Sequence, residues 1–179
     1  PPAPSAVPEL LFMIWGLGVA VSAGRTVLQL VTARLLTRRG EDVAFDVGLG
    51  LPPHTRVVRT SSTKVAMTFG FLRPTIVLPL ESKTWPDGQV RAVLLHEAAH
   101  VRRGDWAWLI FAKVVGALYW LNPLVYWAEA RMRAEGELAA DNAVVRAGLD
   151  PLAYAATLVD LAAGLRSRPS YAALPFVEA

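Results

Sequence analysis

The sequence contains no cysteine in 179 residues, and this absence excludes two kinds of site. Without thiols the chain can form neither a disulfide framework nor a thiolate metal site. A zinc ion bound to this chain must therefore take nitrogen and oxygen ligands, which suits a catalytic site better than a structural one. The length is sufficient for one domain with a sizeable core.

Charge is also scarce. Charged residues make up 18% of the chain and hydrophobic residues 54%, whereas soluble domains carry about 25% charged residues. Six tryptophans add to this apolar character, which predicts association with membrane lipid. The net charge is only +3, and we find no patch in which basic and aromatic residues alternate, so we expect no direct nucleic-acid binding. The first residue is proline, which suggests a fragment of a longer protein.

The N-terminal part of the sequence predicts an anchor. Residues 1–8 carry four prolines and are expected to form a linker. The next segment, residues 9–36, holds an apolar run and a basic flank. A helix needs about 20 apolar residues to cross a bilayer, and we predict a transmembrane helix over about Glu9–Val31. The alternative is a buried helix of a soluble domain.

The basic flank predicts the orientation of this helix. Arginines in the loop that follows a transmembrane helix favour the cytoplasmic side. The domain that follows is therefore expected in the cytoplasm, and the arginines concerned are Arg34, Arg38 and Arg39.

Four short segments rich in β-branched residues follow, separated by turn residues. Together they predict a small antiparallel sheet. They lie near Val43–Val47 and at Thr55–Thr60, Lys64–Phe69 and Thr75–Leu78.

The second half of the chain predicts four helices. Asp87 is placed to cap the first, which Gly104 ends, and Asp105 to cap the second, which runs to Leu121. This second helix is apolar nearly all round, so it lies either in a core or in lipid. The other two are expected over Pro123–Ala147 and from Pro151 to about Leu165. Residues 37–168 thus form one mainly helical α+β domain, and residues 169–179 form a tail.

The pentapeptide at residues 96–100, His-Glu-Ala-Ala-His, is the most informative feature. Residues at i and i+4 share one face of a helix, so His96 and His100 can bind one metal ion. Glu97 is then placed to act as the general base that accepts a proton from the attacking water. A solvated helix face or a satisfied core is the alternative.

A catalytic zinc site takes a third protein ligand, and the segment ELAAD supplies a candidate. Glu137 and Asp141 also stand at i and i+4 on a helix, among small and apolar residues. We assign Glu137 as the third ligand and Asp141 as the carboxylate that orients a ligand histidine. The alternative is neutralisation of both carboxylates by nearby arginines, namely Arg131, Arg133 and Arg146.

These motifs carry a resemblance to a known family. HEAAH, RRGD, WLNPLVYW and ELAAD, with TFGFLRPTIVLP upstream and YAATL downstream, resemble the BlaR1/MecR1-type zinc metallopeptidases of family M56. The similarity covers roughly Ser61 to Ala163. It implies a gluzincin-like, zincin-like fold with one Zn²⁺ held by His96, His100 and Glu137, and Glu97 as the catalytic base. Gly136 departs from the pattern, where a larger residue is expected.

The resemblance also implies a function. It predicts a zinc endopeptidase of the bacterial inner membrane that faces the cytoplasm and acts in signal transduction. Its protein or peptide substrate would be itself or a transcriptional repressor. A homodimer is a further possible partner arrangement. The rival interpretations are a constitutive quality-control protease of the HtpX type and a transducer whose zinc is only structural.

Two further assignments concern the substrate. Arg146 and Tyr154, and less so His54, are candidates to stabilise the oxyanion. The segment Val65, Ala66, Met67, Thr68 and Phe69 is predicted to be an edge strand that pairs with an extended substrate.

Overall fold

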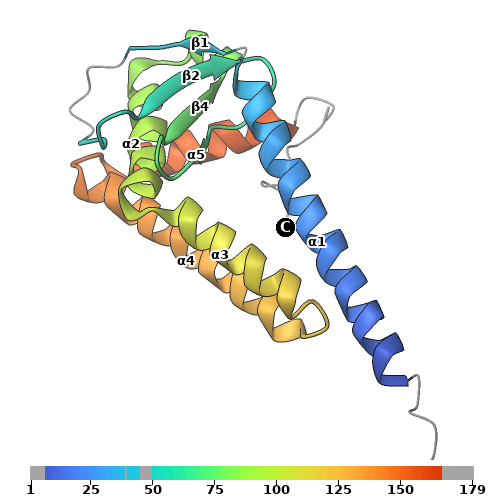
Figure 1. Cartoon of the computed structure of the whole chain (residues 1–179). Coiled ribbons are helices and arrows are strands. Elements are labelled where there is room, and N and C mark those ends of the chain that lie inside the picture. The colour runs from blue at the N-terminus through green and yellow to red at the C-terminus, as the bar shows by residue number, and fades with distance from the viewer. Residues whose placement is uncertain (1–6, 39, 45–49, 167–179) are drawn as a thin grey trace, which may run out of the picture.

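The computed structural model of the chain describes residues 7–38, 40–44 and 50–166, and it confirms the predicted fold class (Figure 1). A long helix precedes a small sheet, and four helices follow the sheet. The elements are α1 (Val7–Arg38), β1 (Glu41–Asp42), β2 (Arg56–Thr60), β3 (Met67–Phe69), β4 (Thr75–Pro79), the 3₁₀ helix η1 (Leu80–Thr84), α2 (Asp87–Arg103), α3 (Asp105–Leu118), α4 (Pro123–Arg146) and α5 (Pro151–Arg166).

The sheet is mixed, and the prediction that it would be wholly antiparallel is wrong in this respect. Its strand order is β1-β2-β4-β3, and β2 runs parallel to β4 while both other pairs are antiparallel. The chain reverses twice between β2 and β4, so that β4 returns in the direction of β2. Gly70, at a φ of 91°, allows the second reversal. As a result, β3 lies at one edge of the sheet.

The first strand is shorter than predicted and begins earlier. β1 comprises only Glu41 and Asp42, which pair with Arg59 and Val58 of β2. Val43 and Ala44 are not in a strand, and the rest of the predicted Val43–Val47 segment lies outside the described residues. Most of the predicted linker and the predicted tail also lie outside them.

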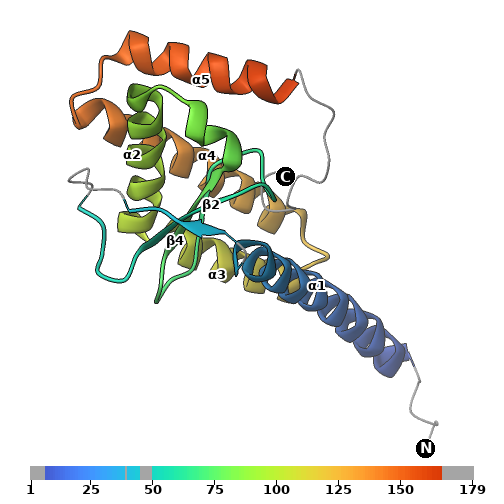
Figure 2. The ribbon, with the colours of Figure 1, turned by 90° about the horizontal axis from the view of Figure 1, so that it is seen from above.

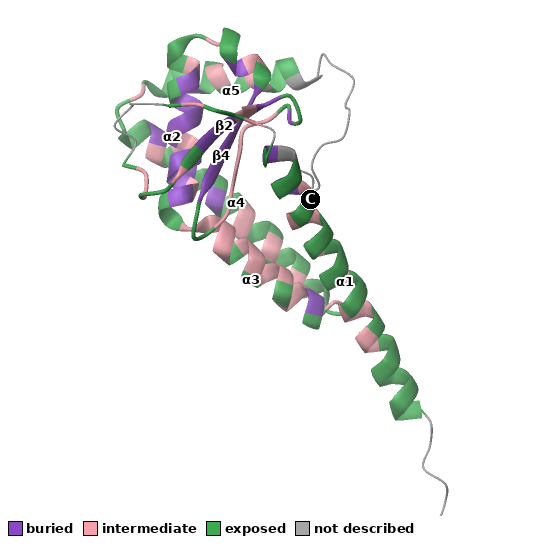
Figure 3. Cartoon of the chain, turned by 45° about the horizontal axis from the view of Figure 1, so that its top comes forward, coloured by how far each residue is buried: buried purple, intermediate pink, exposed green. Residues whose placement is uncertain are grey.

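The core lies between the sheet and α2. Ile76 and Leu78 of β4 pack with Leu94 and Ala98 of α2, and all four side chains are fully buried. Figure 3 shows this concentration of buried residues in the sheet and α2, in contrast to the exposed length of α1. The apolar stripe of α2 thus fixes which of its faces turns away from the core.

The ends of α2 and α3 differ from the predicted caps. The N-cap position of α2 is Pro86, and Asp87 is the first helical residue. Its negative charge there interacts favourably with the helix dipole. Gly104 ends α2 in a left-handed conformation, as expected for a C-terminal glycine. It also occupies the N-cap position of α3, so Asp105 does not cap that helix. Its carboxylate is therefore available for another partner.

α3 and α4 form an antiparallel hairpin that returns to α2 (Figure 1). α3 ends at Leu118, three residues before the predicted end. Asn122 caps α4, because its side chain accepts a hydrogen bond from the amide of Leu124. The C-terminal half of α4 then packs against α2, which brings the ELAAD segment beside the HEAAH segment.

α1 extends away from the rest of the structure (Figure 2). It has 32 residues and is longer than the predicted Glu9–Val31 segment. Val7–Leu35 is long and apolar enough to cross a membrane, and none of its most apolar stretch is buried. Its main contacts with the rest of the structure are with α3 and β2.

Candidate metal centre

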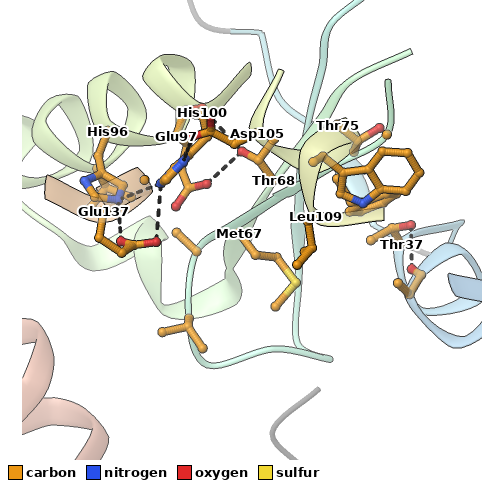
Figure 4. Close-up of a pocket in the computed structure, with 18 of the residues that line it drawn as sticks. Thr37, Met67, Thr68, Thr75, His96, Glu97, His100, Asp105, Leu109 and Glu137 are labelled. Carbon is orange, nitrogen blue, oxygen red and sulfur yellow. Dashed lines mark hydrogen bonds and ion pairs between the residues drawn. The ribbon is translucent and has the colours of Figure 1, made fainter. Parts of the chain in front are cut away.

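α2 presents His96 and His100 on the same face, one turn apart. Their Nε2 atoms are 3.1 Å apart. Glu137 of α4 approaches both, with its Oε2 3.3 Å from Nε2 of His96 and its Oε1 3.7 Å from Nε2 of His100. Figure 4 shows the three side chains pointing toward one another. Two helices that are distant in sequence thus bring three donor groups to one point.

A polar group also holds the far side of each imidazole. Nδ1 of His96 lies 3.1 Å from Oδ1 of Asp141 and 3.1 Å from the hydroxyl of Tyr154. The Tyr154 hydroxyl in turn donates a 2.7 Å hydrogen bond to Asp141. Nδ1 of His100 lies 2.7 Å from Oδ2 of Asp105. A carboxylate can only accept, so these partners favour a proton on Nδ1 of each ring.

This arrangement leaves unprotonated nitrogens facing a carboxylate. With protons on both Nδ1 atoms, the Nε2 atoms of His96 and His100 present lone pairs to each other and to Glu137. Three electron-rich groups at such distances repel one another unless a cation lies between them. Tetrahedral zinc with bonds of about 2.0–2.1 Å places its ligand atoms about 3.3 Å apart, close to the separations found here. The three residues therefore fit a zinc ion.

The pKa shifts of His96 and Glu137 match this electrostatic picture. Burial opposes a charge on His96, but its hydrogen bond with Glu137 and the negative charges of Glu97 and Asp141 prevail and raise its pKa. The hydrogen bond with His96 lowers the pKa of Glu137 in spite of partial burial, and the charges of His100 and Arg103 contribute. The pocket thus favours a cation at this point, whether a proton or a metal ion.

Glu97 is a buried carboxylate beside the three donor groups. Its side chain is only 6% exposed, and its Oε2 accepts a 2.7 Å hydrogen bond from the hydroxyl of Thr68 on β3. Burial raises its pKa, and the Thr68 hydrogen bond opposes that rise. The strand at the edge of the sheet therefore holds the residue predicted to be the base.

The site opens into a cleft of about 1900 Å³. The cleft is large enough for an extended peptide, and its walls come from seven elements besides α2. Representative lining residues are Val31 of α1, Phe69 of β3, Trp108 of α3, Glu137 of α4 and Leu158 of α5.

Comparison with known sequences shows the family to which this chain belongs. The sequence profile of the BlaR1 peptidase M56 family matches residues 3–179. The chain belongs to the M56 peptidase family. M56 peptidases are metal-dependent, and among the described residues of this M56 chain His96, His100 and Glu137 form a group that could hold a metal ion.

Two curated proteins are similar to parts of this M56 chain. Regulatory protein BlaR1 of Bacillus licheniformis is 29% identical over 158 residues, which is 78% of this chain and 25% of that protein. Methicillin resistance mecR1 protein of Staphylococcus aureus is 28% identical over 94 residues, which is 52% of this chain and 16% of that protein. The M56 chain thus spans a quarter or less of the length of these relatives.

The structure separates the candidate oxyanion residues. The Tyr154 hydroxyl lies on the Nδ1 side of His96, opposite the nitrogen that faces Glu137, and is engaged by Asp141. This position suits a residue that orients His96 rather than one that contacts substrate. Arg146 is exposed, and neither it nor His54 lines the cleft. This geometry does not favour the predicted oxyanion roles of these three residues.

The roles of two polar residues in the M56 site were not predicted from the sequence. Asp105 was assigned to a helix cap, although its place five residues after His100 allows it to reach back to that ring. Arg103 was not assigned, yet its Nη1 donates a 2.9 Å hydrogen bond to the carbonyl of Gly136 and its Nη2 lies 3.2 Å from Asp105. Both belong to the RRGD segment, so the signal was present in the motif.

Gly136 lies at this junction. A Cβ atom there would stand 3.8 Å from Oδ2 of Asp105, which is ordinary contact, but a longer side chain would meet that carboxylate. Glycine therefore allows α4 to approach the start of α3 closely, next to Glu137.

Proposed function

We propose that this chain is the catalytic part of a membrane-anchored zinc endopeptidase of the bacterial inner membrane. The observation that carries the proposal is the convergence of His96, His100 and Glu137 with the buried carboxylate of Glu97 beside them. Two imidazoles and one carboxylate are the ligand set of catalytic zinc hydrolases, which leave one position for water.

The roles of the side chains follow from their positions. His96, His100 and Glu137 would hold the ion, and Asp141, Tyr154 and Asp105 would orient the two rings. When bound, zinc supplies Lewis acidity toward the attacking water and the peptide carbonyl. Glu97, whose Oε2 is held by Thr68, accepts the proton of that water at Oε1 and delivers it to the leaving amine.

We further propose that the substrate binds as an extended strand along β3. β3 is the terminal strand of the sheet on this side and lies next to α2, with Met67, Thr68 and Phe69 all lining the cleft. An extended peptide can add to such an edge through its main chain. The Thr68–Glu97 hydrogen bond supports this proposal, since it sets the base directly beside that edge.

The proposed setting is signal transduction. The relatives are named as a regulatory protein and a methicillin resistance protein, and we transfer a regulatory role from them to this chain. The substrate would be a transcriptional repressor, this protein itself, or both. Arg34 and Arg38 at the end of α1 support an orientation in which the domain faces the cytoplasm.

The decisive experiment compares the protein with its Glu97→Gln and Glu137→Gln variants. We expect Glu97→Gln to keep one zinc per chain while cleavage of a protein substrate or of the chain itself falls by at least about 100-fold, because the base is lost. Glu137→Gln should lose both zinc and cleavage. Metal analysis and gel-based cleavage assays provide the two measurements. Cleavage by Glu97→Gln at the parent rate would refute the catalytic assignment and leave a structural zinc site.

A further inference from the structure

The α3–α4 hairpin has an inverted distribution of polarity. Three of its charged side chains lie between the helices: the Nζ of Lys113 on α3 lies 2.8 Å from Oε1 of Glu129 on α4, and the same oxygen accepts a 2.7 Å bond from Arg133. The outward positions carry large apolar side chains instead, namely Trp108, Phe111, Val114 and Leu118 of α3 and Leu124 and Trp127 of α4. Water-facing helices show the opposite pattern.

The tip of the hairpin is attached to α1. The indole Nε1 of Trp15 donates a 2.9 Å hydrogen bond to the carbonyl of Leu118, and that of Trp120 donates a 3.2 Å bond to the carbonyl of Trp15. Trp120 packs directly on Gly18, where a Cβ atom would have no room. The tip and the apolar half of α1 therefore form one packed unit.

The point of attachment fixes the position of the tip relative to the membrane. Trp15 lies within the uncharged stretch of α1 between Glu9 and Arg25. At 1.5 Å per helical residue, Trp15 is about 9 Å from the first of these charges and about 15 Å from the second. If this stretch of α1 lies in lipid, a tip that contacts Trp15 lies in lipid as well.

Three carbonyl groups of the turn at the tip have the internal partners that lipid requires. In a bilayer core each backbone polar group needs a partner within the protein. Here Trp15 binds the carbonyl of Leu118, the Tyr126 hydroxyl donates to the carbonyl of Trp120, and the amide of Asn122 donates to the carbonyl of Tyr119. Two side chains and one backbone amide thus provide hydrogen bonds that these carbonyls would otherwise need from water.

We propose that the tip of the α3–α4 hairpin, residues 114–127, inserts into the bilayer beside α1 as a re-entrant element. The hairpin enters and leaves on the side of the metal centre, because α3 begins at Asp105 and α4 returns to Glu137. The inference rests on the membrane placement of α1 in the proposed function, and it does not depend on peptidase activity.

Because the sequence contains no cysteine, single cysteines can be introduced and labelled at chosen positions to test this inference. Single cysteines replace Leu124 and Trp127 at the tip, Leu17 on the exposed face of α1, and Ser61 in an exposed turn next to β2. Each variant is spin-labelled and reconstituted into vesicles of phosphatidylcholine and phosphatidylglycerol. Electron paramagnetic resonance then measures how far oxygen, which is enriched in lipid, and a water-soluble nickel chelate reach each label.

Insertion predicts that labels at Leu124 and Trp127 behave like the label at Leu17. All three should show a ratio of oxygen to nickel accessibility several-fold above that at Ser61. A lipid-like label at Leu17 with water-like labels at both tip positions overturns the inference and leaves the membrane span intact. A water-like label at Leu17 overturns the span and the inference together. Protection from both reagents, with dipolar broadening between labels, shows that a second copy covers the tip and also overturns the inference.

Discussion

At the scale of single residues, Thr68 controls the state of the proposed base. Its hydroxyl donates to Glu97, and this hydrogen bond lowers the pKa of a carboxylate that burial raises. Glu97 must be ionised to accept a proton. Loss of the Thr68 hydroxyl should therefore raise the pKa of Glu97 and reduce the fraction of active enzyme on the acidic side of the pH profile.

Thr68→Val tests this relation with little change in shape. We expect the acidic limb of the kcat/KM profile to move to higher pH, with activity on that limb lower by about tenfold, the effect of about 1.4 kcal/mol in a hydrogen bond to a charged group. The profile is measured with a fluorogenic peptide between pH 5 and 8, chosen because general bases of this kind titrate near there. Thr68→Ser keeps a hydroxyl and should keep the parent profile. An acidic limb that stays in place in Thr68→Val would contradict the assigned role.

The sequence was informative about side chains whose relation is local. His96 and His100 share a face because of helical periodicity, which is visible in five residues of sequence. The contacts of Asp105 and Tyr154 were not predicted in this form. The Asp105 contact spans only five residues and could have been found from the RRGD segment. The Tyr154 contact depends on how α5 is oriented against α2, and no short-range pattern encodes that orientation.

At the scale of elements, the helices followed from their patterns but the strand pairing did not. Asn122-Pro123 and Gly104 mark helix ends through local backbone chemistry, which the structure bears out. The parallel pairing of β2 with β4 depends instead on which side of β4 the β3 strand occupies. The residue pattern of a strand, whether alternating or wholly apolar, does not indicate which neighbour it pairs with or in which direction.

The junction of α2, α3 and α4 is held by Arg103. Its guanidinium binds the carbonyl of Gly136, directly before Glu137, and also the carboxylate of Asp105 behind His100. Arg103→Met retains the aliphatic part of the side chain but removes both contacts. We expect the zinc affinity to fall by about tenfold, as for other residues that support metal ligands from outside the coordination shell.

Competition with a chromophoric chelator measures this affinity. Arg91→Met, at an exposed position of the same helix, is the matched control and should bind zinc like the parent protein. Equal affinities for the two variants would show that Arg103 does not position Glu137 or His100.

At the scale of the whole molecule, α1 forms one wall of the cleft that contains the candidate metal centre. Val27, Val31 and Arg34 of α1 line the same cleft as His96 and Glu137. A polypeptide in this cleft would therefore run beside the anchoring helix. The relative position of α1 and the α3–α4 hairpin then determines the shape of the substrate site, and the contact between Gly18 and Trp120 becomes important for it.

Gly18→Leu tests that contact. A leucine side chain would occupy the space of the Trp120 indole and break both hydrogen bonds between Trp15 and the tip. Overpacking of this kind costs about 1–3 kcal/mol, and we expect a loss of that size in the free energy of unfolding, measured by denaturant titration in detergent micelles. A Cβ atom added at Gly16 on the same helix meets no atom within 4 Å, so Gly16→Leu provides the control, with stability equal to or above that of the parent protein. Equal stability of the two variants would mean that the hairpin is not fixed to α1, and α1 would then be a tether rather than a wall of the cleft.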